Sequence, residues 1–410
     1  MTTAITGGTL VDGAGNPPVA NGLVLIEKDR IAYAGPADGV RIPGGATVVD
    51  AKGCTVLPGL MDVHVHISMS SPTDWRLDHY RRSPGRIAFE TTRNLRSTVE
   101  AGVTTIRTVS DIGHLDVAAR DAVRDGLCIG PRIVPCGKGL SSTGGHGQKL
   151  PCWICQSHGE VVEIVDGAEA ITSAVRRQAR AGAEWIKVFQ TGGVVDKHGR
   201  IDAEEFLPEE FTAAIEAAKL LGMPVAVHAH NRPAILRSIR AGARSVEHGM
   251  DFDEECARVA AEHGTFLVPT LTVMDNIVRM GKTAGVADYV IENVRKRTEQ
   301  HVKYVRYAHE VGVPIAAGTD AGSILTPHGA AGCEVANLGR IGFSPLDAIR
   351  TATETAAKLL RLDDKLGTLT NGKLADVIVV AGDVMSNLAL LEDRNNVRRV
   401  MIGGQTIVER

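Results

Sequence analysis

Short apolar runs alternate with longer amphipathic stretches along the middle of the chain. Two of the amphipathic stretches, 202–222 and 288–312, have the apolar spacing of helices, and each ends on a glycine. Eight strands that alternate with helices over about 300 residues predict a parallel (β/α)8 TIM barrel, an α/β fold. The apolar runs, each of strand length, are 60–67, 103–110, 131–137, 184–193, 223–230, 243–249, 265–271 and 313–322.

Both ends of the chain have a different pattern. Residues 1–57 contain short apolar stretches separated by turns, and GLVLIEKDRIAYAG is typical of a β-hairpin. The C-terminal stretches DVIVVAGD and VRRVMIGGQTIVER repeat this pattern, with Gly-Asp and Gly-Gly turns. Because neither end can bury its apolar face alone, we expect a small β-sandwich domain from residues 1–57 and 365–410, beside a barrel formed by residues 58–364.

An open, doubly wound sheet is the alternative arrangement for alternating strands and helices. Such a sheet normally carries a glycine-rich phosphate loop after its first strand. No loop of this kind follows DVHVHI, so the pattern favours the closed barrel.

Composition narrows the classes of function. The formal net charge is −3, from 45 basic and 48 acidic residues, and aromatic residues make up only 4% of the chain. We therefore expect no nucleic-acid partner, because neither a basic surface nor a set of aromatic side chains for stacking on bases is indicated. No apolar run has the length of a membrane span and the N-terminus lacks a signal-peptide pattern, so we expect a cytoplasmic protein without membrane contact.

The cysteines argue against a disulfide framework, because seven of them, an odd number, are spread over a long chain. Cys152 and Cys155 form a C-x-x-C motif, but no second pair lies at the spacing of a zinc ribbon. We expect reduced thiols in a loop, since a redox role would require the motif to open a helix.

Side chains of the kinds that bind metals lie at the ends of the predicted strands, where a TIM barrel carries its active site. His64 and His66 are two residues apart on one strand, so both imidazoles face the same side and point into the mouth of the barrel. Two neutral imidazoles in that position can bind one cation. The other strand ends carry a lysine, two histidines and an aspartate, namely Lys187, His228, His248 and Asp320.

Lys187 requires a separate explanation, because an ammonium group inside a barrel is costly unless it is paired or loses its charge. The amine can be deprotonated, or it can react with carbon dioxide to give a carbamate that bridges two metals. It can also pair with Asp320 or Glu184 without a metal. The sequence of this segment alone leaves all three explanations open.

The complete set of strand-end residues resembles the amidohydrolase superfamily. The shared features are H-x-H at the first strand, lysine at the fourth, histidines at the fifth and sixth, and GTDAG at the eighth. LPGLMDVHVH and GTLTNGKLADVIVV are similar as well, so the resemblance covers nearly the whole chain. SSTGGHG, WIKVFQTGG and HAHNRPAILRSIRAGARSVEHG resemble the metal-dependent dipeptidases and carboxypeptidases that cleave Xaa-Pro or Xaa-Arg/Lys substrates, a subgroup that includes the ochratoxin-hydrolysing amidase.

The resemblance implies two divalent metal ions, usually zinc. A hydroxide that bridges both ions would attack the amide, and Asp320 would take its proton and pass it to the leaving amine. The implied ligands are two histidines and an aspartate for the more buried ion, two histidines for the other and a bridging N6-carboxylysine, namely His64, His66 and Asp320, then His228 and His248, and Lys187.

Two further histidines are candidates for contact with the substrate. His230 follows His228 on the same strand face, and it either donates to the carbonyl oxygen as negative charge builds up or supports a ligand by hydrogen bonding. Several members of the subgroup carry tyrosine there. His146, in TGGHGQ, either reaches a substrate carboxylate or is an ordinary loop residue. Ser110 stands where many relatives have arginine, and its role is open.

These features predict a binuclear hydrolase that cleaves the amide bond of a dipeptide or an N-acyl amino acid. Relatives are commonly homo-oligomers, some of them octamers, so we expect a homo-oligomer. The alternatives on the same centre are hydrolysis of a cyclic amide, a lactone, a carbamate or an aryl amide such as ochratoxin. A mononuclear deaminase is disfavoured, because Lys187 is well placed and no H-x-x-E follows His228. A barrel without catalytic function would have lost ligands, whereas the full set is present.

Overall fold

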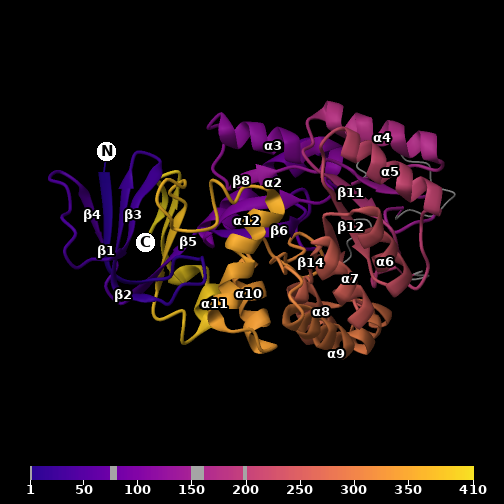
Figure 1. Cartoon of the computed structure of the whole chain (residues 1–410). Coiled ribbons are helices and arrows are strands. Elements are labelled where there is room, and N and C mark those ends of the chain that lie inside the picture. The colour runs from indigo at the N-terminus through magenta and orange to yellow at the C-terminus, as the bar shows by residue number, and fades with distance from the viewer. Residues whose placement is uncertain (1, 74–80, 149–160, 197–200) are drawn as a thin grey trace.

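The structure, a computed structural model, describes residues 2–73, 81–148, 161–196 and 201–410. A β-sheet built from the two ends of the chain lies beside a larger body in which helices surround strands (Figure 1). The predicted TIM barrel with a separate sheet from both chain ends is confirmed by this arrangement. Among the helices in the described ranges, none combines the length and the apolar character needed to cross a membrane.

The sheet of the chain ends has eight strands. They are β1 (Thr2–Leu10), β2 (Val19–Glu27), β3 (Arg30–Pro36), β4 (Thr47–Asp50), β5 (Cys54–Pro58), β15 (Val377–Ala381), β16 (Val397–Ile402) and β17 (Gln405–Glu409). Their order is β17-β16-β15-β5-β1-β2-β3, with β4 also paired to β1. The two chain ends meet where β15 runs antiparallel to β5.

Apolar side chains from both chain ends share one core in this sheet. Ile5 and Val24 from the N-terminal strands belong to the same buried cluster as Val377 and Met401 from the C-terminal strands. Neither end therefore buries its apolar face alone, which is the physical reason for the pairing. The domain boundaries after residues 57 and 364 stay a prediction.

The barrel strands are divided between two parallel sheets. All of these strands except β10 are largely buried, as a parallel sheet covered by helices requires. A three-stranded sheet has the order β6-β7-β8 and a six-stranded sheet has the order β10-β9-β11-β12-β13-β14. Their bounds are Leu60–Val65 (β6), Val103–Thr108 (β7), Arg132–Val134 (β8), Gly139–Ser141 (β9), Val162–Ile164 (β10), Ile186–Phe189 (β11), Val225–Ala229 (β12), Ser245–His248 (β13) and Phe266–Val268 (β14).

The third and eighth predicted strands are less regular than their apolar runs suggest. In the third run the strand ends before Pro135, because proline has no backbone N–H to donate. The carbonyl of Pro135 still accepts from the N–H of Glu184 at 2.8 Å. The eighth run, 313–322, forms two isolated bridges instead of a strand. These bridges join Ile315 to β14 and Ala321 to β6, and they close the barrel.

The helices of the described segments surround the barrel strands (Figure 1). The helix within 202–222 begins only at Pro208, because the residue before a proline is disfavoured in the α conformation and proline suits the first helical position. Gly222 and Gly312 follow their helices with positive φ, as the sequence indicated. The bounds are Pro84–Glu100 (α2), Leu115–Arg124 (α3), Ala168–Ala181 (α4), Pro208–Leu220 (α5), Arg232–Ala241 (α6), Glu254–His263 (α7), Leu271–Ala284 (α8), Asp288–Glu310 (α9), Ala331–Arg340 (α10), Pro345–Thr351 (α11) and Glu354–Leu360 (α12).

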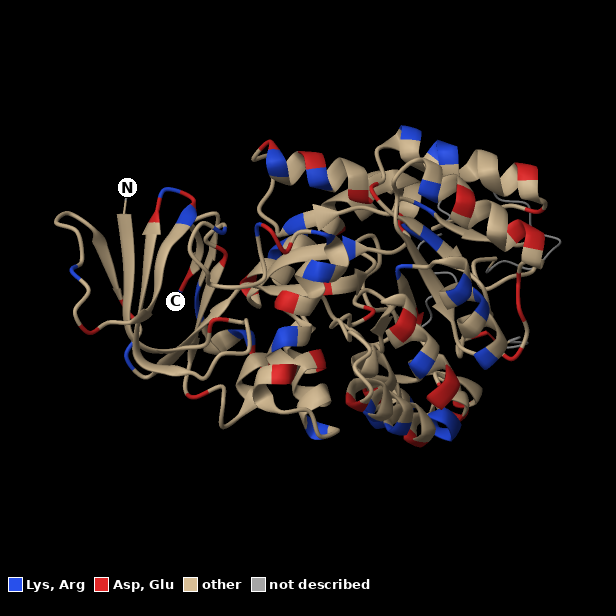
Figure 2. Ribbon diagram, viewed as in Figure 1, with Lys and Arg blue, Asp and Glu red and all other residues tan. Residues whose placement is uncertain are grey.

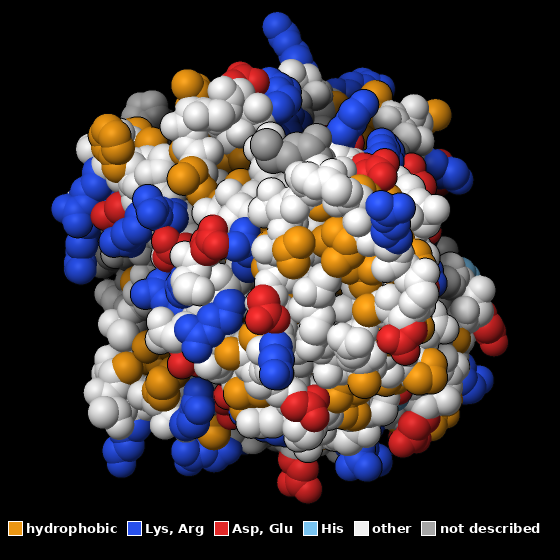
Figure 3. All heavy atoms as spheres, turned by 90° about the vertical axis from the view of Figure 1, so that its left-hand side faces the viewer, with side chains coloured by type: hydrophobic (Ala, Val, Ile, Leu, Met, Phe, Trp, Pro, Cys, Tyr) orange, Lys and Arg blue, Asp and Glu red, His pale blue; other side chains and the backbone are white. Residues whose placement is uncertain are grey.

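Charged side chains are distributed over the outer helices and the terminal sheet with both signs mixed (Figure 2). The face on the side of the terminal sheet likewise carries interspersed basic and acidic side chains (Figure 3). The charge pattern of these surfaces therefore does not point to a functional site. Polar residues instead gather inside the barrel, at the ends of its strands.

Candidate metal centre

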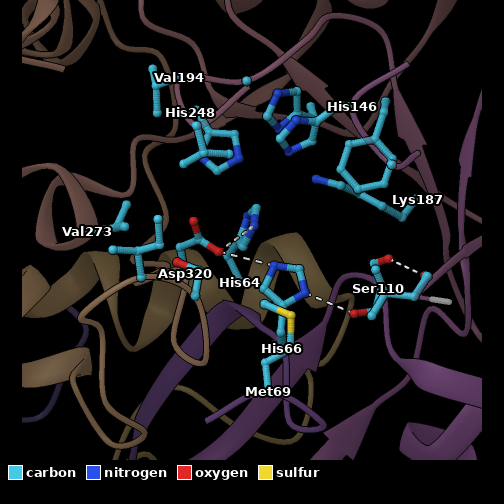
Figure 4. A pocket seen from close by; sticks show the side chains of 18 of the residues that line it. His64, His66, Met69, Ser110, His146, Lys187, Val194, His248, Val273 and Asp320 are labelled. Atoms are coloured by element: carbon cyan, nitrogen blue, oxygen red, sulfur yellow. Dashed lines mark hydrogen bonds and ion pairs between the residues drawn. The ribbon is translucent and has the colours of Figure 1, made fainter. Parts of the chain in front are cut away.

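One pocket at the ends of the barrel strands brings together the residues that the sequence singled out (Figure 4). Parallel strands end at a common rim, so residues far apart in the chain meet there. The pocket is lined by all six predicted ligands and by the other three residues considered above, namely His64, His66, Lys187, His228, His248 and Asp320, then Ser110, His146 and His230.

His64, His66 and Asp320 form a compact group of potential ligands. One ligand atom from each lies within 4.8 Å of the other two. Oδ1 of Asp320 is 3.1 Å from Nε2 of His66 and 3.7 Å from Nε2 of His64. Two imidazoles and a carboxylate are common ligands of zinc and similar divalent cations. The geometry therefore suits one cation between these three side chains.

His228 and His248 lie on the neighbouring strands β12 and β13, with 4.6 Å between their ring centroids. The ring of His248 is also 4.8 Å from that of His64, so this pair adjoins the first group. In Figure 4, Lys187 and His248 point into the cavity from one side, while His66 and Asp320 approach it from the other. The two groups of predicted ligands therefore share one cavity.

In each of the four predicted histidine ligands, one ring nitrogen contacts another group of the protein. The second ring nitrogen remains for another partner. Contacts of this kind fix the tautomer and the ring orientation of histidines that bind metals. The contacts are His64 Nδ1 with Glu247 Oε2 at 2.7 Å, His66 Nδ1 with the Ser110 carbonyl at 2.9 Å, His228 Nε2 with the Gly192 carbonyl at 3.4 Å, and His248 Nδ1 with Thr270 Oγ1 at 2.7 Å.

The surroundings of His64, His228, His248 and Asp320 favour the protonation states that bind a cation. Loss of solvent and the neighbouring basic groups hold the pKa of His228 and of His248 well below the usual range. Burial also lowers the pKa of His64 to about 4. Burial alone would raise the pKa of Asp320, but the hydrogen bond from His66 and the nearby imidazoles lower it overall. Neutral nitrogens and an anionic oxygen are the states that metal binding requires.

Lys187 is fully buried, and within the described part of the chain its Nζ has no hydrogen-bond partner. Of the partners that the sequence left open, Glu184 instead binds Arg120 at 2.9 Å, and no ion pair with Asp320 is seen among the described residues. Burial lowers the pKa of Lys187 to about 8. A buried amine without a partner in a cluster of potential ligands suits a lysine that is modified to an anion.

Unusual backbone conformations occur where these side chains leave the strands. His248 and Asp320 have φ values of 67° and 62°, and Ser110 and Thr270 also have positive φ. Positive φ is uncommon for residues other than glycine, and such positions cluster at functional sites. The backbone at these strand ends therefore adopts energetically costly conformations that orient the side chains.

The two histidines proposed to contact substrate lie beside His228. The ring of His146 stacks on that of His228 with 4.6 Å between centroids, and its Nδ1 is 2.7 Å from Oδ2 of Asp196. The ring of His230 is 4.5 Å from that of His228, and its buried Nδ1 has no partner among the described residues. Asp196 was missed by the sequence analysis, because nothing local marks an aspartate 50 positions away as the partner of His146.

The cavity has apolar walls around this polar centre. One wall belongs to a buried cluster that includes Val194, Val273 and Ile277, and another belongs to a cluster that includes Met69 and Phe189. The pocket holds about 800 Å³ of empty space, including open solvent at its mouth. It can therefore accommodate a substrate with apolar groups next to the reacting bond.

The cysteines of the described segments lie outside this site. The five described cysteines are free thiols, and none of them lines the pocket. Cys152 and Cys155, the C-x-x-C motif, lie outside the described residues.

The chain is similar to known proteins in both sequence and structure. The model of the amidohydrolase family matches residues 55–407. An ochratoxinase of Aspergillus niger is 30% identical over 425 residues, which cover 98% of this chain and 86% of the relative. A crystal structure of a Xaa-Pro dipeptidase with bound methionine in the active site has a TM-score of 0.90 and 33% identity, with full coverage of both chains. A prolidase complexed with N-methylphosphonate-L-proline has a TM-score of 0.89 and 28% identity, again with full coverage of both chains.

Proposed function

Because the chain belongs to the amidohydrolase family, we propose that it hydrolyses amide bonds at a centre of two divalent cations, most suitably zinc. The observation that carries the proposal is the convergence on one cavity of four histidines, an aspartate and a buried lysine whose Nζ has no hydrogen-bond partner among the described residues. Imidazole nitrogens, a carboxylate and a lysine amine that can become a carbamate are the kinds of ligand that a cation site needs.

The ligands divide into two sets joined by the lysine. The neutral amine of Lys187 would add to carbon dioxide and release one proton to solvent, which replaces a neutral amine with an anionic carbamate. When bound, the two cations would supply an acidic water and polarise the scissile carbonyl. The proposed ligands are His64, His66 and Asp320 for one cation, His228 and His248 for the other, and the carbamate of Lys187 between them.

Asp320 would move the proton in this proposal. Its carboxylate lines the cavity, and its backbone N–H donates to the His64 carbonyl at 2.9 Å, which holds the segment in place. As an anion it would accept the proton of the attacking water and then donate it to the leaving amine. It would thus serve as both a ligand and a proton carrier.

The two histidines beside His228 would orient the substrate. An N–H of His230 would donate to the carbonyl oxygen as negative charge builds up there. His146 donates its Nδ1–H to Asp196. With a second proton on Nε2, the same ring would also donate to a substrate carboxylate. This assigns the carbonyl to His230 and a free carboxylate to His146.

The apolar walls favour a dipeptide or N-acyl amino acid with apolar groups on both sides of the amide. A second candidate is an aryl amide of the ochratoxin type, and it is favoured by the same walls and by the similarity to the A. niger ochratoxinase. Cyclic amides, lactones and carbamates use the same chemistry. The chain would work as a homo-oligomer.

The test is a substrate panel assayed with zinc-loaded protein. Xaa-Pro dipeptides, Xaa-Arg dipeptides, N-acyl amino acids and aryl amides are compared at equal protein concentration, and zinc is measured on the same samples. We expect about two zinc ions per chain and activity that a chelator removes and zinc restores. Full activity in chelator, or no hydrolysis of any amide by zinc-loaded protein, would contradict the proposal.

A further inference from the structure

A fully buried ion pair lies inside the barrel next to a proposed ligand. Arg107 on β7 and Glu247 on β13 are both 0% exposed, and Nη2 of Arg107 is 2.8 Å from Oε1 of Glu247. The other carboxylate oxygen of Glu247 is 2.7 Å from Nδ1 of His64. The three side chains therefore form a continuous chain of contacts across three strands.

The other two nitrogens of Arg107 also donate hydrogen bonds. Its Nε donates to the Val63 carbonyl at 2.7 Å, and its Nη1 donates to Oγ of Ser245 at 3.0 Å. The guanidinium also lies over the ring of Trp185 at 4.6 Å. A buried ion pair is weak evidence for a gain in stability, because removing two charges from water is costly. The hydrogen bonds from all three guanidinium nitrogens instead indicate that Arg107 holds Glu247 in one position.

The strand geometry shows how Glu247 reaches this position. Successive residues of a strand point to opposite faces, so Glu247 and His248 should lie on opposite sides of β13. Ser245 and Glu247 do share a face, since their side chains contact each other. His248 nevertheless also lines the pocket, and it has a φ of 67°. The unusual backbone at His248 thus allows two adjacent side chains to serve the same site.

We propose that Glu247 is a positioning residue of the metal centre, which accepts the Nδ1–H of His64 and so directs Nε2 of His64 to the cation. Nε2 of His64 already faces Asp320, at 3.7 Å from its Oδ1. Arg107 balances the charge of Glu247 and fixes its carboxylate. The inference rests on the proposed function, because it assigns Glu247 a role in the affinity of that same centre.

The experiment compares zinc affinity with fold stability. Zinc-free wild type and Glu247→Gln are titrated with zinc against a chromophoric chelator, and thermal unfolding of the zinc-free proteins is measured in parallel. Glutamine has the same size but lacks the charge that holds Nδ1–H. We expect the affinity of one of the two zinc sites to fall by about 10- to 100-fold, the usual effect of losing such a partner.

The matched control is Glu210→Gln, another buried glutamate. Its carboxylate accepts from the N–H groups of Gly167 and Leu207 at 2.5 and 2.8 Å, at the start of α5 and away from the proposed ligands. We expect this variant to lose stability and to keep the zinc affinity of the wild type. The control thus separates the effect of a lost buried carboxylate from the effect on the metal centre.

A second variant covers the case in which Glu247→Gln does not fold. Glu247→Asp keeps the charge but withdraws the carboxylate by one methylene, and we expect a smaller loss of affinity at the same site. Wild-type affinity at both sites in each folded variant would overturn the inference and leave the proposed function intact. A wild-type protein that binds no zinc would overturn the proposed function and the inference together.

Discussion

The two halves of the proposed centre differ in how they are held. On one side, His66 and Asp320 are in direct contact at 3.1 Å, and His64 is fixed by Glu247. On the other side, Nζ of Lys187 has no hydrogen-bond partner among the described residues. In the proposed centre, the fold alone would complete the first half, whereas the second would require a change in the chemistry of its lysine. This difference predicts that binding of the two cations depends to different degrees on the solution conditions.

The largest effect is expected from the half that the fold completes. Asp320→Asn removes an anionic ligand and the proton carrier together, so we expect kcat to fall by about 10²- to 10⁴-fold, the range for loss of a general acid–base. The measurement is kcat on the best substrate of the panel, with zinc content on the same sample. Asp38→Asn, at an exposed position, is the matched control. Wild-type kcat in Asp320→Asn would remove the basis for the assigned role.

The next effect distinguishes the two halves directly. Lys187→Ala removes the proposed bridge, so we expect about one zinc ion per chain instead of about two, and a severe loss of activity. A small carboxylate such as acetate should restore part of both, because it can occupy the space of the carbamate. Lys219→Ala, at a lysine whose side chain is 76% exposed, is the control. Two zinc ions and full activity in Lys187→Ala without added carboxylate would show that the halves do not differ in this way.

The pH dependence of assembly should follow the same lysine. Its pKa is lowered to about 8, and only the neutral amine, which predominates above the pKa, adds to carbon dioxide. At constant dissolved carbon dioxide, the rate at which zinc-free protein regains activity with zinc should rise about fivefold from pH 7 to pH 8 and level off above about pH 9. A rate that does not change with pH, or with removal of carbon dioxide, would speak against the carbamate.

The smallest effect concerns the substrate side. His146→Asn should raise KM about 10-fold or more for substrates with a free carboxylate, since hydrogen bonds to charged groups contribute about 1.5–3 kcal/mol. The same substrates with the carboxylate converted to an amide should show little change. Asp196→Asn should act in the same direction, because Asp196 contacts His146 at 2.7 Å. Equal effects on both substrate series would place His146 elsewhere in the reaction.

The sequence predicted the barrel and the strand-end residues because both depend on local patterns. Alternation along one strand placed His64 and His66 on one face, and the rhythm of strands and helices placed the other strand ends at the same rim. The irregular eighth strand was not visible in this way. Its apolar run looks like the others, and only the pairing with its neighbours shows that it forms isolated bridges.

Other features of the site depend on contacts that no local pattern encodes. The rule of alternation predicts that Glu247 points away from the face of His248, and only the backbone conformation at His248 shows that both face the interior. Arg107 lies in an apolar run and contacts Glu247 across 140 positions. A charged residue inside a buried strand was the available signal, but its partner is defined only by the closed barrel.

The most direct test of the proposed two-cation centre is anomalous diffraction at the zinc edge from crystals grown with zinc and bicarbonate. We predict two peaks, one among His64, His66 and Asp320 and one beside His228 and His248. We also predict density for a carboxylate group on Nζ of Lys187. A single peak beside an unmodified lysine, or no peak at these residues, would contradict the proposed centre.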